Sequence, residues 1–168
     1  THAGKKINDI FDLTEPLDGS FKTPTIENLI GCDVVFFATP NGIAMNMAES
    51  LISKGIRIID ISADFRIKDV KVWEEWYGKK HTSPSLLSES IYGLPEIPGQ
   101  KSKIRDALIV ANPGCYPTAS LLGLLPICQS LEKQKIIVDA KSGISGAGRN
   151  LDNTKLFPEG TDNFQAYA

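Results

Sequence analysis

Residues 33–61 read DVVFFATPNGIAMNMAESLISKGIRIIDI, and this stretch decides the fold. Residues 33–38 form a continuous β-branched and aromatic run, which is typical of a strand buried on both faces of a parallel sheet. Residues 43–54 carry apolar side chains at three- and four-residue spacing and are followed by Gly55, which predicts an amphipathic helix with a glycine stop. Residues 56–61 predict a second strand. This order is that of a parallel βαβ unit and indicates an α/β fold.

Outside this unit, residues 108–111 and 136–140 are short apolar runs that predict two further strands. Residues 66–107 are the least regular part of the chain and are rich in Pro and Gly. We expect Asp69 to cap a short helix in this region. Trp73, Trp76 and Tyr77 would share one face of that helix, and we interpret this face as packing rather than as a cofactor site.

The composition excludes several classes of protein. The 168 residues suit one domain of ordinary size, and 18 basic against 20 acidic residues give a net charge of -2. This charge predicts no nucleic-acid partner and no attraction to a membrane surface. No apolar run is long enough to span a bilayer, and no signal peptide opens the chain. Three cysteines without a close pair favour a reducing, cytoplasmic setting and no metal.

Cys115 is the strongest candidate for a catalytic residue. It lies in the segment ANPGCYPTAS, residues 111–120, after a predicted strand and before a leucine-rich stretch that suits a buried helix. We expect Pro117 to be the first helical residue, with Tyr116 kept out of the helix. Because the amides at a helix start favour a thiolate over a thiol, this position predicts a nucleophile.

The other cysteines and the two histidines are weaker candidates. We interpret Cys32, beside a strand, and Cys128, at the end of an apolar helix, as small buried hydrophobes. A thiolate usually needs a general base or an ion-pair partner. The residues around His2 and His81 do not indicate that either histidine has this role, and we expect both at the surface.

Arg66 follows the second predicted strand, in the segment DISADFR of residues 60–66. Open α/β sheets bind ligands at the carboxyl ends of their strands, which predicts a ligand near Ser62 and Arg66. The planar guanidinium can hold a carboxylate or a phosphate. The alternative is a surface ion pair of Arg66 with Asp64 or Asp69.

Residues 142–149, SGISGAGR, follow the last predicted strand. Their three glycines allow backbone amides to approach a phosphate or carboxamide group closely. The spacing does not match the dinucleotide-binding pattern G-x-G-x-x-G, and a plain flexible loop is about equally compatible with it.

The sequence resembles the N-acetyl-gamma-glutamyl-phosphate reductases of arginine biosynthesis over nearly its whole length. The most specific shared segment is PGCYPT, residues 113–118, which differs from the nucleophile turn of the related aspartate-semialdehyde dehydrogenases. The other segments that carry the resemblance are residues 3–7, 35–42, 60–66, 76–78, 92–96 and 142–149.

The resemblance implies an oxidoreductase that uses NADPH to reduce N-acetyl-glutamyl 5-phosphate to N-acetyl-glutamate 5-semialdehyde, with release of phosphate. It implies that Cys115 is the catalytic nucleophile and forms a thioester, and that Arg66 binds the substrate. The NADP-binding residues that it implies are Thr39, Pro40, Asn41, Gly42, Ser62, Asn112, Ser142, Gly143, Ser145 and Gly146.

The resemblance also implies the organisation of the chain. We expect residues 1–112 to be a Rossmann-like, parallel-sheet NADP-binding domain without its first strand and Gly-rich turn, and residues 113–168 to begin an α+β catalytic and dimerisation domain of a homo-oligomer. The catalytic histidine of the family lies beyond the last residue here. We therefore expect an internal fragment that turns over slowly or not at all by itself.

Two alternatives remain open from the sequence. The first is a sister reductase that acts on a related acyl phosphate, either carrier-bound or aspartyl phosphate. The second is a non-catalytic nucleotide-binding module with the same fold, against which a cysteine at a helix start argues.

Overall fold

The structure is a computed structural model that describes residues 2–131, 135–147, 156–164 and 166. The chain divides into two compact units, Thr1–Cys128 and Gln129–Ala168, and each is described by itself. None of the helices in the described residues is long and apolar enough to cross a membrane.

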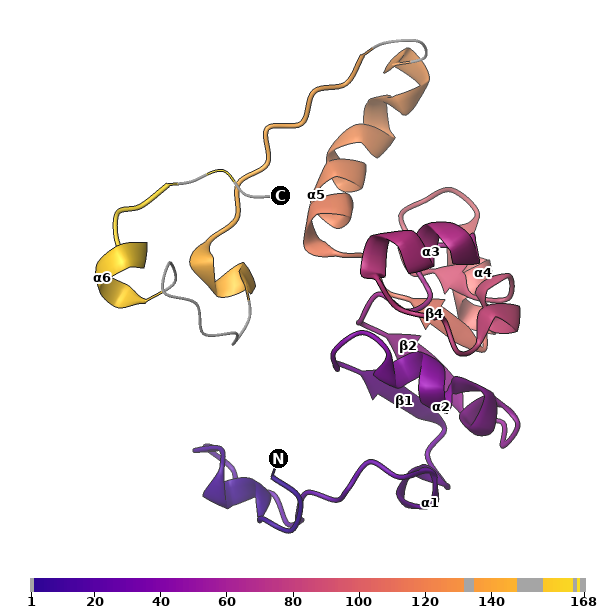
Figure 1. Ribbon diagram of the computed structural model, residues 1–168, viewed down its shortest axis with the longest axis vertical. Helices are drawn as coiled ribbons and strands as arrows, with labels where there is room; N and C mark the ends of the chain where they lie inside the picture. Colours follow the sequence, from indigo (N-terminus) through magenta and orange to yellow (C-terminus); the bar gives the residue numbers. More distant parts are fainter. Residues whose placement is uncertain (1, 132–134, 148–155, 165, 167–168) are drawn as a thin grey trace. The chain divides into compact units, whose positions relative to one another are not determined.

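A four-stranded parallel sheet forms the centre of the first unit (Figure 1). Its order is β1-β2-β4-β3. The register aligns the last residue of every strand in one row, because Phe37 pairs with Asp60, Asp60 with Ala111, and Ala111 with Tyr92. All four carboxyl ends therefore lie at one edge of the sheet. The strands are β1 (Val34–Phe37), β2 (Arg57–Asp60), β3 (Ile91–Tyr92) and β4 (Ile109–Ala111).

The predicted βαβ unit is confirmed as β1, α2 (Ile43–Ile52) and β2. Gly55 adopts φ +75°, a left-handed conformation that ends the helix, and the Ile56 amide turns back to the Leu51 carbonyl at 3.1 Å. The strand predicted at residues 108–111 is confirmed as β4.

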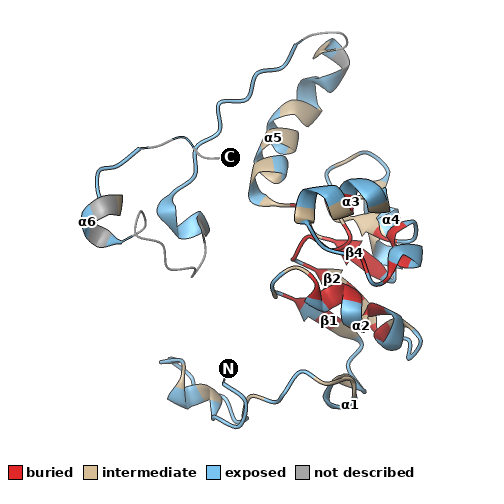
Figure 2. Ribbon diagram, viewed as in Figure 1, coloured by how far each residue is buried: buried red, intermediate tan, exposed pale blue. Residues whose placement is uncertain are grey.

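The core lies between one face of the sheet and the helices α2 and α3 (Val70–Tyr77). Figure 2 shows the buried residues gathered on β1, β2, β4 and α2. The helix contributes Ala44, Met45, Ala48 and Leu51, all on one side at helical spacing. The sheet contributes alternate residues, as the pleat requires: Val35, Phe37, Ile58, Ile109 and Ala111.

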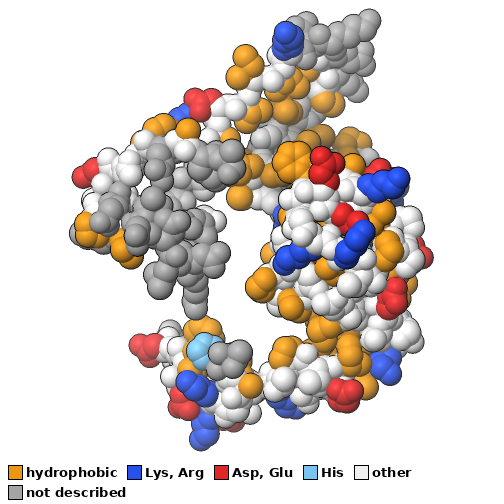
Figure 3. Space-filling view, in the orientation of Figure 1, with side chains coloured by type: hydrophobic (Ala, Val, Ile, Leu, Met, Phe, Trp, Pro, Cys, Tyr) orange, Lys and Arg blue, Asp and Glu red, His pale blue; other side chains and the backbone are white. Residues whose placement is uncertain are grey.

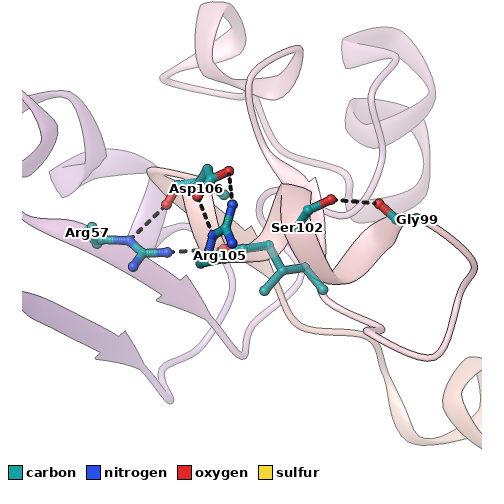
Figure 4. A network of polar contacts seen from close by, with 7 residues as sticks. Arg57, Gly99, Ser102, Arg105 and Asp106 are labelled. Atoms are coloured by element: carbon teal, nitrogen blue, oxygen red, sulfur yellow. Dashed lines mark hydrogen bonds and ion pairs between the residues drawn. The ribbon is translucent and has the colours of Figure 1, made fainter.

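The opposite face of the sheet is only partly covered. Phe36 is 60% exposed, so the prediction that β1 is buried on both faces is wrong. Arg57 points to this face, where it reaches the end of α4 (Gln100–Asp106) and donates to the carbonyls of Ala107 at 2.9 Å and Ile104 at 3.1 Å (Figure 4). A cation at the carboxyl end of a helix satisfies unpaired carbonyls, so Arg57 joins α4 to the start of β2.

The predicted cap of α3 is confirmed, because the Asp69 Oδ1 accepts from the amides of Lys71 at 2.8 Å and Val72 at 3.3 Å. Trp73 is fully buried and donates from Nε1 to the Ala63 carbonyl at 2.8 Å. Its ring packs on Tyr77. Trp76 is 77% exposed, so the prediction of one shared aromatic face is wrong for this residue. A residue three positions from Trp73 lies about 60° away from it around a helix, far enough to reach solvent.

The predicted strand at residues 136–140 does not form. These residues are exposed, and none of the described residues pairs with them. A strand needs a hydrogen-bonded neighbour, and apolar β-branched residues alone do not supply one.

The other elements of the first unit are 3₁₀ helices at Ile7–Asp9 and Pro84–Leu87, with α1 (Ile26–Leu29) and α5 (Cys115–Leu124). A further 3₁₀ helix, Leu125–Leu131, runs across the boundary between the two units. The second unit contains a 3₁₀ helix at Ile144–Ala147 and α6 (Phe157–Gly160).

The start of α2 is held by a residue from another part of the chain. The buried Asp64 carboxylate accepts from the Gly42 amide at 2.8 Å and from the Met45 amide at 3.0 Å. The α2 N-cap residue, Gly42, has no side chain to do this. Asp64 therefore joins the loop after β2 to the helix that follows β1.

Replacing Asp64 with Ala should lower the free energy of unfolding by about 3 kcal/mol, because two buried amides lose a charged acceptor. The matched control is Asp69→Ala, which removes an exposed carboxylate that also accepts from two amides and should cost about 1 kcal/mol. Urea denaturation followed by circular dichroism measures both. Equal losses for the two variants would contradict the buried cap.

Candidate active site

The carboxyl edge of the sheet collects the loops that carry the predicted site residues. Residues 38–42 follow β1, residues 61–66 follow β2, Gly93 follows β3, and residues 112–115 follow β4. Since ligands of open α/β sheets bind at this edge, it is the candidate site of the first unit.

Asp60, the last residue of β2, is the centre of this edge and is fully buried. Its carboxylate accepts from the amides of Ser62 at 3.0 Å and Phe65 at 3.2 Å, and from the Ser62 hydroxyl. Its backbone carbonyl accepts from the Asn112 amide at 2.8 Å. Burial raises the pKa of Asp60, these hydrogen bonds oppose the rise, and the charge of Asp64 adds to it.

Arg66 joins the ends of β2 and β4. Its Nε donates to the Asn112 carbonyl and its Nη2 to the Ile61 carbonyl, both at 2.7 Å. A Cβ atom on Gly114 would lie 3.2 Å from the Arg66 Nη1, so the guanidinium lies against the turn before Cys115. The alternative of an ion pair with Asp64 or Asp69 is wrong, because both of these carboxylates accept backbone amides instead.

Cys115 is the first residue of α5 and is exposed. The helix starts two residues earlier than predicted, with Gly114 as its N-cap and Tyr116 inside it, and the Thr118 amide closes the first turn on the Gly114 carbonyl at 3.0 Å. Pro117 fits the third helical position because the first amides of a helix have no intrahelical acceptor. Cys115 thus has the helix-start setting on which the prediction of a nucleophile depends.

Other parts of the prediction around this cysteine are wrong. None of the α5 residues is buried, although the leucine spacing predicted a buried helix. Cys32 and Cys128 are exposed, not buried hydrophobes. Exposure therefore does not distinguish Cys115 from the other cysteines, but its position at the start of α5 does.

His81 is buried at 7% exposure, so its predicted surface position is wrong, whereas His2 is exposed as predicted. The His81 Nδ1 accepts from the Ser83 amide at 3.2 Å, which assigns the proton to Nε2, 2.9 Å from the Asp64 carbonyl. The ring packs edge-on against Trp73 and Phe65. Both ring nitrogens are used in holding the loop, so His81 is a structural residue.

The loop after β1 offers one buried polar atom to a ligand. The Thr39 Oγ1 is buried and has no hydrogen-bond partner among the described residues, which leaves it for a ligand. Asn41 accepts from the Ala63 amide at 3.2 Å and Pro40 is exposed. The Gly42 amide already donates to Asp64, so the start of α2 is not a free anion site.

The remaining predicted cofactor residues lie in three places. The Ser62 hydroxyl is buried against Asp60, and the Asn112 Nδ2 donates to the Pro113 carbonyl at 3.1 Å. Ser142 and Gly143 precede the 3₁₀ helix Ile144–Ala147 in the second unit, which contains Ser145 and Gly146. The four residues of the second unit are exposed, and their role stays a prediction.

The charge distribution adds no further site on the visible face. In Figure 3, Lys and Arg side chains alternate with Asp and Glu over the first unit and form no patch of one sign. In the described residues, no group of three or more His, Cys, Asp or Glu is arranged to hold a metal ion.

Gly93, for which the sequence predicted no role, is closely packed against β4 at this edge. A Cβ there would lie 2.8 Å from Val110 Cγ1 and 3.2 Å from the Ala111 carbonyl oxygen. Its amide donates to the Ala111 carbonyl at 2.8 Å. A glycine directly after a short apolar run was the available signal.

A parallel sheet with a helix-initial cysteine, a backbone-anchored arginine and an unpaired buried hydroxyl at its carboxyl edge defines a ligand-binding α/β domain. The comparison with protein families is specific. The family model "Semialdehyde dehydrogenase, NAD binding domain" matches residues 1–107, and "Semialdehyde dehydrogenase, dimerisation domain" matches residues 115–168. The chain belongs to the semialdehyde dehydrogenase family, and the match to its NAD-binding domain indicates a nicotinamide cofactor.

Curated relatives agree with this family. The chain is 53% identical to the N-acetyl-gamma-glutamyl-phosphate reductase of Aromatoleum aromaticum over 99% of its own length. It is 52% identical to that of Laribacter hongkongensis and 48% identical to that of Cellvibrio japonicus, over 98% of its length in each case. The chain spans 48–49% of the length of these three proteins.

The Asp60 carboxyl should titrate above its ordinary value of 3.8, because burial disfavours the charged form. Since the folded pKa is the higher one, the stability that Asp60 contributes is fully present below pH 3.8 and is lost as the pH rises through the raised value. A ¹³C NMR titration of the Asp60 carboxyl measures this directly. A midpoint at or below 3.8 would show that the hydrogen bonds outweigh burial.

Replacing Gly93 with Ala should destabilise the protein by roughly 1–3 kcal/mol, since the new methyl group overlaps β4. Gly123→Ala is the control, because a Cβ at this position of α5 meets nothing within 4 Å. That change should stabilise the helix by about 0.5–1 kcal/mol. Thermal unfolding separates the two cases, and a neutral Gly93→Ala variant would refute the close contact.

Proposed function

We propose that the protein containing this chain is an N-acetyl-gamma-glutamyl-phosphate reductase. It would reduce N-acetyl-glutamyl 5-phosphate to N-acetyl-glutamate 5-semialdehyde with NADPH and release phosphate, in arginine biosynthesis. The observation that carries the proposal is an exposed Cys115 at the start of α5, directly after the glycine against which the guanidinium of Arg66 lies. Relatives of that name, 48–53% identical over almost the whole chain, support it.

In this mechanism the Cys115 sulfur is the nucleophile. The thiolate attacks the acyl carbon, the carbon–sulfur bond forms, the bond from that carbon to the phosphate oxygen breaks, and phosphate leaves with the electron pair. Cys115 is the first residue of α5, where the backbone amides of the first turn have no intrahelical acceptor. Covalent capture divides one difficult reaction into two easier ones.

Arg66 binds the phosphate group. Its Nε and one N–H of Nη2 are held by backbone carbonyls, and Nη1 points to the Gly114 turn. The guanidinium is thus fixed before the substrate arrives, which reduces the entropy lost on binding. Its positive charge stabilises the phosphate as it leaves.

The nicotinamide cofactor, when bound, supplies the hydride that reduces the thioester carbon. The Cys115 sulfur then leaves as a thiolate as the aldehyde forms. Thr39, Pro40, Asn41 and Gly42, with Ser62 and Asn112, line the cofactor side in this proposal. The buried Thr39 Oγ1 has no hydrogen-bond partner among the described residues and is available to the cofactor. The proposal also includes NADP rather than NAD as the cofactor. It further includes cofactor-binding roles for Ser142, Gly143, Ser145 and Gly146.

The proposed organisation follows from the same function. Residues 1–112 form the NADP-binding part, and residues 113–168 begin the catalytic and dimerisation part. The match to a dimerisation-domain model supports a homo-oligomer, with the acyl phosphate as the small-molecule substrate. Three free cysteines are compatible with a reducing cytoplasm.

Cys115→Ser in the full-length enzyme should abolish NADPH oxidation with the acyl phosphate, because a serine hydroxyl at neutral pH is a far weaker nucleophile than a thiolate. Iodoacetamide should label Cys115 faster than Cys32 and Cys128, which are also exposed but do not start a helix. Mass spectrometry after limited alkylation measures the three rates in one sample.

Cys32→Ser and Cys128→Ser are the matched controls and should keep full activity. Activity of Cys115→Ser near the wild-type rate, or equal labelling of the three cysteines, would contradict the nucleophile. The second result would favour a non-catalytic nucleotide-binding module.

A further inference from the structure

Tyr92 ends β3 in the row of residues that forms the carboxyl edge of the sheet. It pairs in register with Ala111, and its backbone carbonyl accepts from the Gln100 Nε2 at 2.8 Å. The next residue, Gly93, packs against Ala111 and Asn112. The Tyr92 backbone therefore lies beside Ala111, the residue directly before the turn that leads to Cys115.

Two contacts fix Tyr92 relative to Arg66. The Ser90 hydroxyl, two residues before Tyr92, donates to the Phe65 carbonyl at 3.0 Å. The Lys68 ammonium, two residues after Arg66, donates to the carbonyls of Leu87 at 2.7 Å and Ser90, and to the Ser90 hydroxyl. Hydrogen bonds of the residues on either side of Arg66 therefore hold its segment against the segment that leads into β3.

Tyr92 and Arg66 flank the same residue, because the Arg66 Nε donates to the Asn112 carbonyl at 2.7 Å and Gly93, which follows Tyr92, packs against the Asn112 Cα. Burial raises the pKa of Tyr92, and the charge of Arg66 lowers it by a smaller amount. The side chain is half-buried. A neutral phenol beside an arginine is a hydrogen-bond donor that an anion held by that arginine can use.

We propose that Tyr92 is a further substrate-binding residue, whose hydroxyl donates a hydrogen bond to the phosphate group held by Arg66 next to Cys115. The proposal rests on the proposed function for the identity of the anion. Arg66 contributes the charge and Tyr92 a neutral donor. Arg66 lies in the loop after β2 and Tyr92 ends β3, so the two side chains would reach the anion from different elements.

Tyr92→Phe removes only the hydroxyl and tests this role in the full-length enzyme. In the reverse reaction, with semialdehyde, NADP and inorganic phosphate, the KM for phosphate should rise about tenfold, as expected for the loss of one hydrogen bond to a charged group. The KM values for NADP and for the semialdehyde should stay unchanged. Tyr77→Phe, on the Trp73 side of α3, is the matched control and should change none of the three.

A second measurement does not depend on turnover. Inorganic phosphate should slow the alkylation of Cys115 by iodoacetamide, and Tyr92→Phe should need about ten times more phosphate for half protection. The alkylation rate without phosphate should equal that of the wild type, which shows that the Cys115 turn is intact.

The outcomes separate the two proposals. An active enzyme with an unchanged phosphate KM and unchanged protection in Tyr92→Phe overturns the role of Tyr92 and leaves the reductase proposal standing. An enzyme that does not reduce the acyl phosphate but shows phosphate protection weakened by Tyr92→Phe overturns the reductase and supports the anion site. Absence of protection in the wild type overturns the role of Tyr92 as well.

Discussion

The carboxyl edge of the sheet depends on one buried carboxylate, that of Asp60. The side chain binds the loop that follows β2 through Ser62 and Phe65, while the backbone carbonyl of the same residue binds Asn112 after β4. One residue therefore sets both the loop that carries Arg66 and the turn that carries Cys115. The arrangement has a cost, because a carboxylate without a cation partner is unfavourable in the core unless amides compensate it. Those amides come from the loop itself, so the carboxylate and the loop stabilise each other.

Two arginines act at opposite ends of the same pair of strands. Arg57 begins β2 and reaches the carbonyls at the end of α4, whereas Arg66 follows β2 and reaches Asn112 after β4. Each uses the fixed geometry of the guanidinium to donate to two backbone carbonyls. Only Arg66 also faces the start of a helix that carries a cysteine. Both arginines join β2 to a neighbouring segment through backbone carbonyls, and Arg66 in addition places a positive charge at the candidate site.

The sequence predicted the elements whose signal is local. The βαβ unit, the Asp69 cap and the position of Cys115 near a helix start depend on periodicity and on neighbouring residues, and these predictions were nearly correct. The wrong predictions depended on distant partners. Residues 136–140 have the composition of a strand but pair with none of the described residues, and Trp76 is exposed to solvent. His81 is buried by its contacts with Asp64 and Trp73. The cap of α2 could not be foreseen, because Gly42 and Asp64 are 22 residues apart.

The strand order also makes the outer half of the sheet depend on one short strand. β4 pairs with β2 on one side and with β3 on the other, and β3 precedes β4 in the chain. β3 is therefore an edge strand that joins the sheet only through β4. A chain that ended before residue 109 would keep β1 and β2 but would have no place for β3, so the row formed by Asp60, Ala111 and Tyr92 would be incomplete.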